Sequence, residues 1–229
     1  LYIEIECGQI PLRTITTSYM LSDSIGYIRF DNFNETTYTE VVETLKMMKS
    51  RGMRSLILDL SNNFGGLAQS VRQLACEFLN EGDTIETVRG RGGRLIDTYV
   101  AQRSGIFNQE HIVVLVSGFT HSAAELLAAA LQDHNRATII GWQTGGKGTV
   151  TSVYGLPDGS TVTLATARYY TPSGRCIQKP YGANANAASR DWGVIPDEQV
   201  LPDRNVHTQY YYNINGTDFY LCMLESEQV

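Results

Sequence analysis

The sequence predicts an α/β fold in which helices cover a mixed β-sheet. Short apolar runs that are typical of buried strands alternate with longer segments whose apolar residues recur at helical spacing. A third observation adds antiparallel structure, because the turn sequence Pro-Asp-Gly at residues 157–159 separates two runs rich in Thr, Val and Tyr. With 229 residues, the chain is long enough to bury a substantial core.

The individual elements follow from local patterns. Alternating or continuous apolar runs predict strands at residues 2–6, 26–30, 56–60, 112–116 and 138–140. Apolar residues at helical spacing predict helices at residues 38–48, 67–79 and 122–132. The first two helices stop at glycines, Gly52 and Gly82. Residues 180–189, rich in Ala, Asn and Gly, predict an exposed loop.

Composition narrows the function classes. The net charge of −6, from 24 acidic and 18 basic residues, argues against nucleic acid as a partner. No apolar run approaches the roughly 18 to 20 residues that span a bilayer. The four cysteines stand far apart, which weakens a zinc site and leaves disulfides and free thiols both open. We expect no cofactor, and the compartment does not follow from composition.

Two residues carry the strongest chemical signal. Ser122 opens an apolar helix, where the positive end of the helix dipole favours the alkoxide that the serine must become. Lys147 lies between glycines, and if it packs against apolar walls, its charged form is disfavoured and its pKa falls towards neutrality, which suits a general base. Serine with lysine is a known variant of the nucleophile–base arrangement. The pair predicts a serine–lysine peptidase.

Acyl transfer also needs donors for the oxyanion. The backbone N–H of Ala123 lies one residue past the nucleophile, and the glycine-containing loop at residues 63–66 can supply another donor. Both segments follow predicted buried strands, so we expect them at the same sheet edge.

Simpler interpretations compete with this one. Ser122 on its own is more often a helix cap, and Lys147 on its own is more often a solvated loop residue. Residues 141–148 nearly match a phosphate-binding loop, but a strand-like run follows where such a loop must open a helix. His121 and Glu125 stand four residues apart, yet no further ligand cluster supports a metal, so we expect none.

Four segments together resemble the carboxyl-terminal processing peptidases, or tail-specific proteases. The segments are LDLSNNFGG (58–66), SAAE (122–125), GKGTV (146–150), and the pair YTPSGR (170–175) and GVIPD (193–197). Each segment is modest alone, but their order and spacing agree with the family. The resemblance implies the mixed α/β core of the Clp protease and crotonase superfamily.

The resemblance also implies a role for each matching residue. It makes Ser122 the nucleophile, Lys147 the base, and Gly66 and Ala123 the sources of the oxyanion-hole amides. Thr151 stands where the family often has a glutamine that hydrogen-bonds the lysine. In the oxyanion loop, Phe64 stands where the family usually has a proline, and Ser61 stands where it usually has an arginine.

The family usually carries a PDZ domain before its core. We therefore interpret residues 1–15 as the exit segment of a truncated PDZ domain and residues 16–204 as the peptidase core. Residues 205–229 are a tyrosine-rich extension without an assigned role. A core without the PDZ domain is expected to cleave weakly, with little preference for a free carboxyl terminus.

The leading hypothesis is a serine endopeptidase that cleaves unfolded or carboxyl-terminal segments of proteins with the dyad of Ser122 and Lys147. Its partner would be a protein or peptide substrate with an accessible carboxyl terminus, and a homo-oligomer is possible. The first rival is a catalytically impaired peptide-binding module on the same fold. A crotonase-type thioester enzyme is the weaker rival. Family resemblance favours a bacterial cell envelope or periplasmic location.

Overall fold

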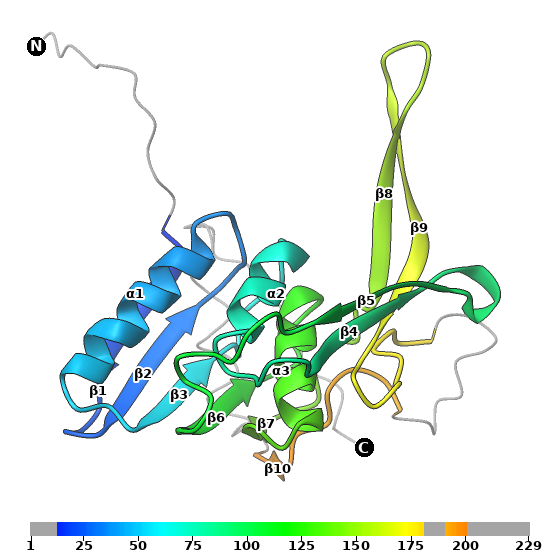
Figure 1. Ribbon diagram of the computed structural model, residues 1–229. Helices are drawn as coiled ribbons and strands as arrows, with labels where there is room; N and C mark the ends of the chain where they lie inside the picture. The colour runs from blue at the N-terminus through cyan, green and yellow to red at the C-terminus, as the bar shows by residue number, and fades with distance from the viewer. Residues whose placement is uncertain (1–12, 181–190, 201–229) are drawn as a thin grey trace, which may run out of the picture. The chain divides into compact units, whose positions relative to one another are not determined.

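A computed structural model describes residues 13–180 and 191–200 (Figure 1). The helices are α1 Thr37–Ser50, α2 Ala68–Ala75 and α3 Ala123–Asp133, with a short 3-10 turn at Arg91–Gly93. The strands are β1 Ile15–Met20, β2 Ile25–Phe30, β3 Ser55–Asp59, β4 Thr84–Arg89, β5 Leu95–Val100, β6 His111–Val116, β7 Thr138–Gly141, β8 Thr149–Gly155, β9 Thr161–Tyr170 and β10 Glu198–Gln199.

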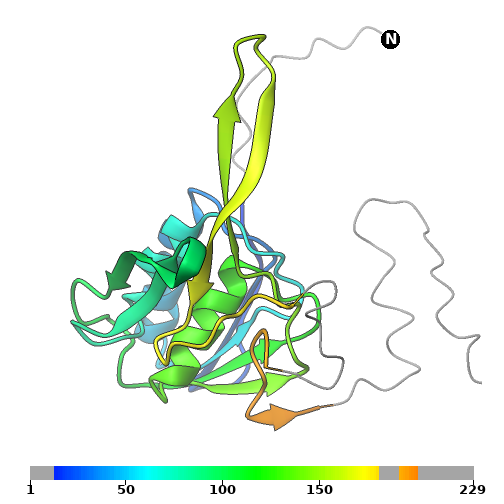
Figure 2. The same cartoon turned by 90° about the vertical axis from the view of Figure 1, so that its right-hand side faces the viewer.

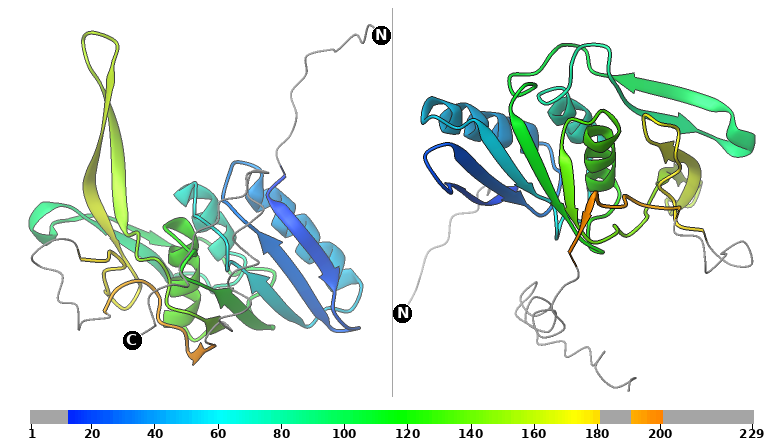
Figure 3. Two further views of the ribbon diagram at one scale, coloured as in Figure 1. Left: turned by 180° about the vertical axis from the view of Figure 1, so that it is seen from behind. Right: turned by 90° about the horizontal axis from the view of Figure 1, so that it is seen from below.

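The larger sheet has the strand order β1-β2-β3-β6-β7-β10. Only β1 runs antiparallel to its neighbour, so the sheet is mixed as predicted. The crossovers β2-α1-β3, β3-α2-β6 and β6-α3-β7 all step in one direction, which puts the three helices on one face of the sheet (Figure 3). Consequently the loops that lead into α2 and α3 leave the carboxyl ends of adjacent parallel strands, β3 and β6.

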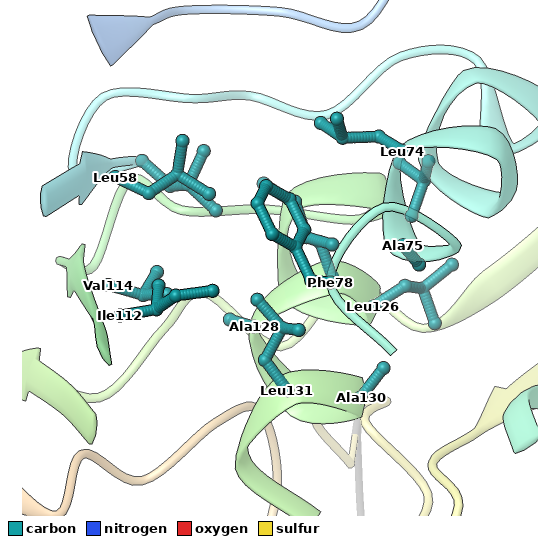
Figure 4. Close-up of a cluster of buried hydrophobic side chains, with 14 of the residues drawn as sticks. Leu58, Leu74, Ala75, Phe78, Ile112, Val114, Leu126, Ala128, Ala130 and Leu131 are labelled. Atoms are coloured by element: carbon teal, nitrogen blue, oxygen red, sulfur yellow. The ribbon is translucent and has the colours of Figure 1, made fainter. Parts of the chain in front are cut away.

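The core lies between this sheet and its helices. Ile28, Leu58, Val114 and Ile139 face one another in register across four strands, and none of them is exposed. Helix α3 is apolar on all sides, and every residue from Ala123 to Leu131 is buried. It packs against α2, β4 and β7, and Figure 4 shows its side chains meeting those of α2 and the sheet. Burial on all sides fixes the position of its first residue.

A second, antiparallel sheet has the order β5-β4-β9-β8. Strands β8 and β9 form the predicted hairpin around residues 157–159, and it projects away from the helices (Figures 1 and 2). Near its base, β9 pairs with β4 at Tyr169 and Tyr170. Lys147 lies two residues before β8. The base of this hairpin therefore determines the position of the lysine backbone.

Several sequence predictions need correction. The predicted helix at 67–79 ends at Ala75 and continues as turns, and β1, β4 and β5 were not predicted. The predicted strand at residues 2–6, the predicted loop at 180–189 except Pro180, and residues 205–229 lie outside the described residues. Cys76 and Cys176 are free thiols. Within the described ranges, no helix is long and apolar enough to cross a bilayer.

Candidate active site

Ser122 occupies a sharp turn between β6 and α3. It is the N-cap of α3, with φ 54° and ψ −118°, and its φ is one of two positive values among the described non-glycine residues. A positive φ in a residue with a Cβ atom costs about 1–3 kcal/mol and is found preferentially at functional sites. A strained strand-to-helix turn also presents the nucleophile in α/β-hydrolases.

The glycine loop after β3 packs directly against this turn. A Cβ atom added to Gly65 would lie 2.8 Å from Ser122 Cβ and 2.7 Å from the carbonyl oxygen of His121. A Cβ atom added to Gly66 would lie 2.1 Å from the carbonyl oxygen of Phe33. Both glycines have positive φ values, 93° and 136°. Only glycine fits either position, and the predicted meeting of the two loops at one sheet edge is confirmed.

Asn63 holds the glycine loop in place. Its side chain is buried, donates from Nδ2 to the carbonyl oxygen of Phe30 over 2.8 Å, and accepts the N–H of Gly65 over 2.9 Å. Its own carbonyl oxygen accepts the N–H of His121 over 3.0 Å. The side-chain amide of Asn63 therefore links the loop to β2, and its backbone carbonyl links the loop to the turn that carries Ser122.

Two backbone donors are left without partners here. Phe33 and Gly66 form an isolated parallel β-bridge. In it the N–H of Phe33 donates to the carbonyl oxygen of Gly65, and the carbonyl oxygen of Phe33 accepts the N–H of Leu67. The N–H of Gly66 therefore takes no part in this bridge. No described residue accepts a hydrogen bond from the N–H of Gly66 or from that of Ala123. These are the two groups that the sequence proposes for the oxyanion hole.

Glu125 connects the serine turn to the lysine loop. Its Oε2 accepts the backbone N–H groups of Ser122 and Lys147, both over 2.8 Å. Its Oε1 accepts the N–H of Gly146 over 2.7 Å and a very short hydrogen bond from the Thr144 hydroxyl. The side chain is fully buried, and this burial raises the pKa of Glu125 although the four donors oppose the shift. With both oxygens occupied, Glu125 acts as a clamp and not as the metal ligand considered above.

No hydrogen bond joins the side chains of the proposed dyad. Lys147 is exposed, and no hydrogen bond joins it to Ser122. The condition that Lys147 packs against apolar walls is therefore not met, because its side chain is exposed. Thr151 is also exposed and pairs with Ala165 on β9, next to an irregularity in the β8–β9 register. The structure thus places the two backbones together but leaves the lysine side chain in solvent.

Two other acidic side chains, Asp59 and Asp133, have structural roles. Asp59 accepts hydrogen bonds from the hydroxyl and backbone N–H of Ser61 and from the Tyr27 hydroxyl. Asp133 accepts the N–H of Ser173 and pairs with Arg175. Among residues 13–180 and 191–200, no three His, Cys, Asp or Glu side chains group as metal ligands.

Comparison with known proteins identifies the family. The profile of peptidase family S41 matches residues 24–200, which contain the glycine loop, Ser122 and Lys147. The chain belongs to peptidase family S41. The predicted resemblance to carboxyl-terminal processing peptidases is thereby confirmed, and so is the α/β fold class.

Similar S41 proteins occur in bacteria and in chloroplasts. The chain is 34% identical to a carboxy-terminal-processing protease of Bartonella bacilliformis over 88% of this chain and 45% of that protein. It is 37% identical to the chloroplastic carboxyl-terminal-processing peptidase 1 of Arabidopsis thaliana, over 66% of this chain and 30% of that one. The chain thus spans less than half the length of these relatives.

A solved S41 structure has the same fold. The photosystem II D1 C-terminal processing protease superposes with a TM-score of 0.72 and 30% identity, covering 86% of this chain and 50% of that one.

The sequence analysis missed two features of the site in this S41 core. It did not identify Thr144, and it did not predict that Glu125 acts as a clamp. The position of Glu125 three residues after a helix-capping serine was an available signal, whereas nothing in the sequence marks Thr144.

Proposed function

We propose that this chain is the catalytic core of a serine endopeptidase that cleaves unfolded or carboxyl-terminal segments of proteins. The observation that carries the proposal is the clamp of Glu125, which fixes the backbones of Ser122 and Lys147 to one oxygen. The packing of Gly65 against Ser122 Cβ supports it, because this contact brings the oxyanion loop to the nucleophile. Membership of family S41 and the names of the relatives agree with peptide hydrolysis.

In the proposed mechanism, Ser122 Oγ attacks the scissile carbonyl carbon while the neutral amine of Lys147 takes the hydroxyl proton. The N–H groups of Gly66 and Ala123 stabilise the oxyanion of the tetrahedral intermediate. Collapse breaks the C–N bond, and the Lys147 ammonium returns the proton to the leaving amine. Water, deprotonated by Lys147, then attacks the acyl-enzyme and releases the carboxylic acid and Ser122.

The exposed amine of Lys147 requires one further step. A bound substrate strand would cover the mouth of the site and remove water from the lysine. Excluding water from the site also strengthens the hydrogen bond through which the lysine would take the serine proton. Substrate binding would therefore activate the base as well as position the peptide.

We assign Thr151 the supporting position beside Lys147, although its side chain is exposed on β8. A hydroxyl there would accept a hydrogen bond from the amine and orient it. Thr151→Val should lower kcat, and Thr151→Gln should restore or exceed the original value. Equal activity of all three proteins would contradict the assignment.

The proposed domain division follows the sequence. Residues 1–15 would be the exit segment of a PDZ domain, residues 16–204 the core, and residues 205–229 an extension. A core without a PDZ domain would cleave with little preference for a free carboxyl terminus, and the location we propose is the envelope of a bacterial cell. Comparing peptides with free and amidated carboxyl termini tests this selectivity, using this chain and a form extended at its amino end.

The decisive experiment is hydrolysis of a denatured protein by the chain, with products identified by mass spectrometry. We expect the unmodified chain to cleave internal bonds and to leave an acyl-enzyme at Ser122 that a rapid acid quench traps. Ser122→Ala should show neither the cleavage nor the acyl-enzyme. Peptide binding without any turnover by the unmodified chain would instead favour a binding module.

A further inference from the structure

Three aromatic rings gather beside the proposed nucleophile. The ring of Phe64 stacks on that of His121, with centroids 6.3 Å apart and planes 16° apart. The ring of Phe119 lies 6.3 Å from that of Phe64 at a tilt of 60°. We call these three residues the aromatic cluster. It joins the two loops that carry the oxyanion donors and the serine.

The cluster is held rigidly by its backbone and by close packing. The N–H of Phe64 donates to the carbonyl oxygen of Asp31 over 3.1 Å, and His121 Nδ1 lies 2.9 Å from the carbonyl oxygen of Phe119. The imidazole also packs on Gly145, where an added Cβ would lie 2.1 Å from His121 Nε2. A substrate therefore meets a preformed surface and does not have to order it.

Position and exposure connect the cluster to catalysis. Phe64 precedes Gly65, whose α-carbon faces Ser122, and His121 precedes Ser122 itself. Phe64 is nevertheless 47% exposed, and Leu67, on the other side of the two glycines, is 44% exposed. The oxyanion loop thus has an exposed apolar side chain on each side. A peptide whose carbonyl carbon reaches Ser122 must lay a neighbouring side chain close to one of them.

We propose that Phe64, supported by His121, is the specificity-determining surface for a large apolar side chain next to the scissile bond. The inference rests on the proposed peptidase function and adds the class of substrate residue. Covering an exposed ring with an aliphatic or aromatic side chain removes apolar surface from water, and the stacked ring favours an aromatic guest further.

Binding tests the proposal without requiring turnover. In the Ser122→Ala background, the affinity of labelled peptides with Phe, Leu, Ala or Ser beside the scissile position is measured by fluorescence anisotropy. We expect Phe and Leu peptides to bind about tenfold more tightly than Ala peptides. Adding Phe64→Ala should abolish this preference, and Phe64→Leu should retain it for the Leu peptide. Leu21→Ala serves as the control, because Leu21 is 54% exposed in the turn at the opposite sheet edge.

The outcomes separate this proposal from the proposed function. An unchanged preference in Phe64→Ala overturns the specificity role, and so does an equal loss of affinity for all four peptides, which would indicate a purely structural residue. If the unmodified chain hydrolyses no peptide but its preference depends on Phe64, the surface stands and the peptidase function fails. A turnover series should show the same loss of preference in kcat/KM.

Discussion

Ser122 and Lys147 donate their backbone N–H groups to the same oxygen atom, Oε2 of Glu125, each over 2.8 Å. The proposed nucleophile and base are thus positioned through their main chains before their side chains meet. Because the shared carboxylate is fully buried, substrate or solvent cannot easily compete for it. The distance between the two backbones is therefore a fixed property of the fold, whereas the lysine side chain remains free to move.

Replacing Ser122 separates strain from chemistry. Ser122→Ala should lower kcat/KM by at least about a thousandfold, since the nucleophile is lost. Ser122→Gly should be equally inactive but more stable than Ser122→Ala by about 1 kcal/mol, because glycine adopts a φ of 54° without strain. Urea unfolding and peptide turnover measure the two effects. Equal stability of both variants would show that the turn is not strained.

Replacing Lys147 should affect activity and not stability. Its side chain is exposed and has no hydrogen bond, so Lys147→Ala should change the free energy of unfolding by less than about 0.5 kcal/mol. Lys147→Arg should be nearly inactive, because guanidinium cannot accept the serine proton. The matched control is Lys46→Arg, at another exposed lysine, on α1. An active Lys147→Arg enzyme would contradict the assignment of the base.

Replacing one acceptor oxygen of the clamp by an amide donor should weaken both folding and catalysis. In Glu125→Gln one acceptor oxygen becomes a donor that faces other donors, which should cost about 2 kcal/mol of unfolding free energy. Activity should fall as well, because the lysine loop loses its anchor. Glu43→Gln, at an exposed site on α1, provides the control. A fully stable and active Glu125→Gln protein would show that the four hydrogen bonds do not matter.

The same substitution predicts a pH dependence of stability. Burial raises the pKa of Glu125 above 4.5, so between that pH and the raised pKa the folded chain binds more protons than the unfolded chain. The free energy of unfolding must therefore fall as pH rises across this window. Subtracting the Glu125→Gln curve isolates this residue from Glu86, whose pKa burial also raises. The disadvantage of the glutamine variant should be largest at acid pH, and a constant difference would contradict the shift.

The glycine loop should not tolerate side chains. Gly66→Ala places a Cβ atom 2.1 Å from the Phe33 carbonyl oxygen at a φ of 136°, which should cost at least about 3 kcal/mol. Gly82→Ala has a φ of 87° but meets no atom within 4 Å, so it should cost only about 1 kcal/mol. Thermal unfolding of the two variants measures the loss of stability in each. Gly82→Ala reports the cost of backbone strain alone, and Gly66→Ala reports the cost of strain together with steric overlap.

The sequence predicted the parts of the fold whose patterns are local. The parallel strands ending at Asp59 and Val116 are short apolar runs, and their residues alternate mainly between buried and half-buried positions. Strand β4 escaped prediction because Glu86 is a charged residue at a buried position, where Arg72 neutralises it from another element. An ion pair between residues that are far apart in the sequence cannot be recognised from the local sequence pattern.

The same distinction applies to the site. Ser122, Gly66 and Lys147 were predicted because motifs contain them, but the exposure of Lys147 was not. Burial of a loop side chain depends on which residues pack over it, and the glycines next to Lys147 do not determine which residues these are. Thr144 was missed because its role exists only once the loop folds back onto Glu125.

The Glu125 clamp also has a consequence for the order in which this chain becomes active. Glu125 and its four donors all lie within a continuous stretch that contains α3, β7 and the loop before β8, so their association closes only short loops. The Gly66 donor comes from the preceding crossover and reaches Ser122 only after β3 has paired with β6. A partly folded chain in which only the β6-α3-β7 crossover and the loop after it have formed would thus hold its serine and lysine backbones in place without an oxyanion hole. Hydrolytic power would arise only when the two crossovers dock, which makes it a late event in folding.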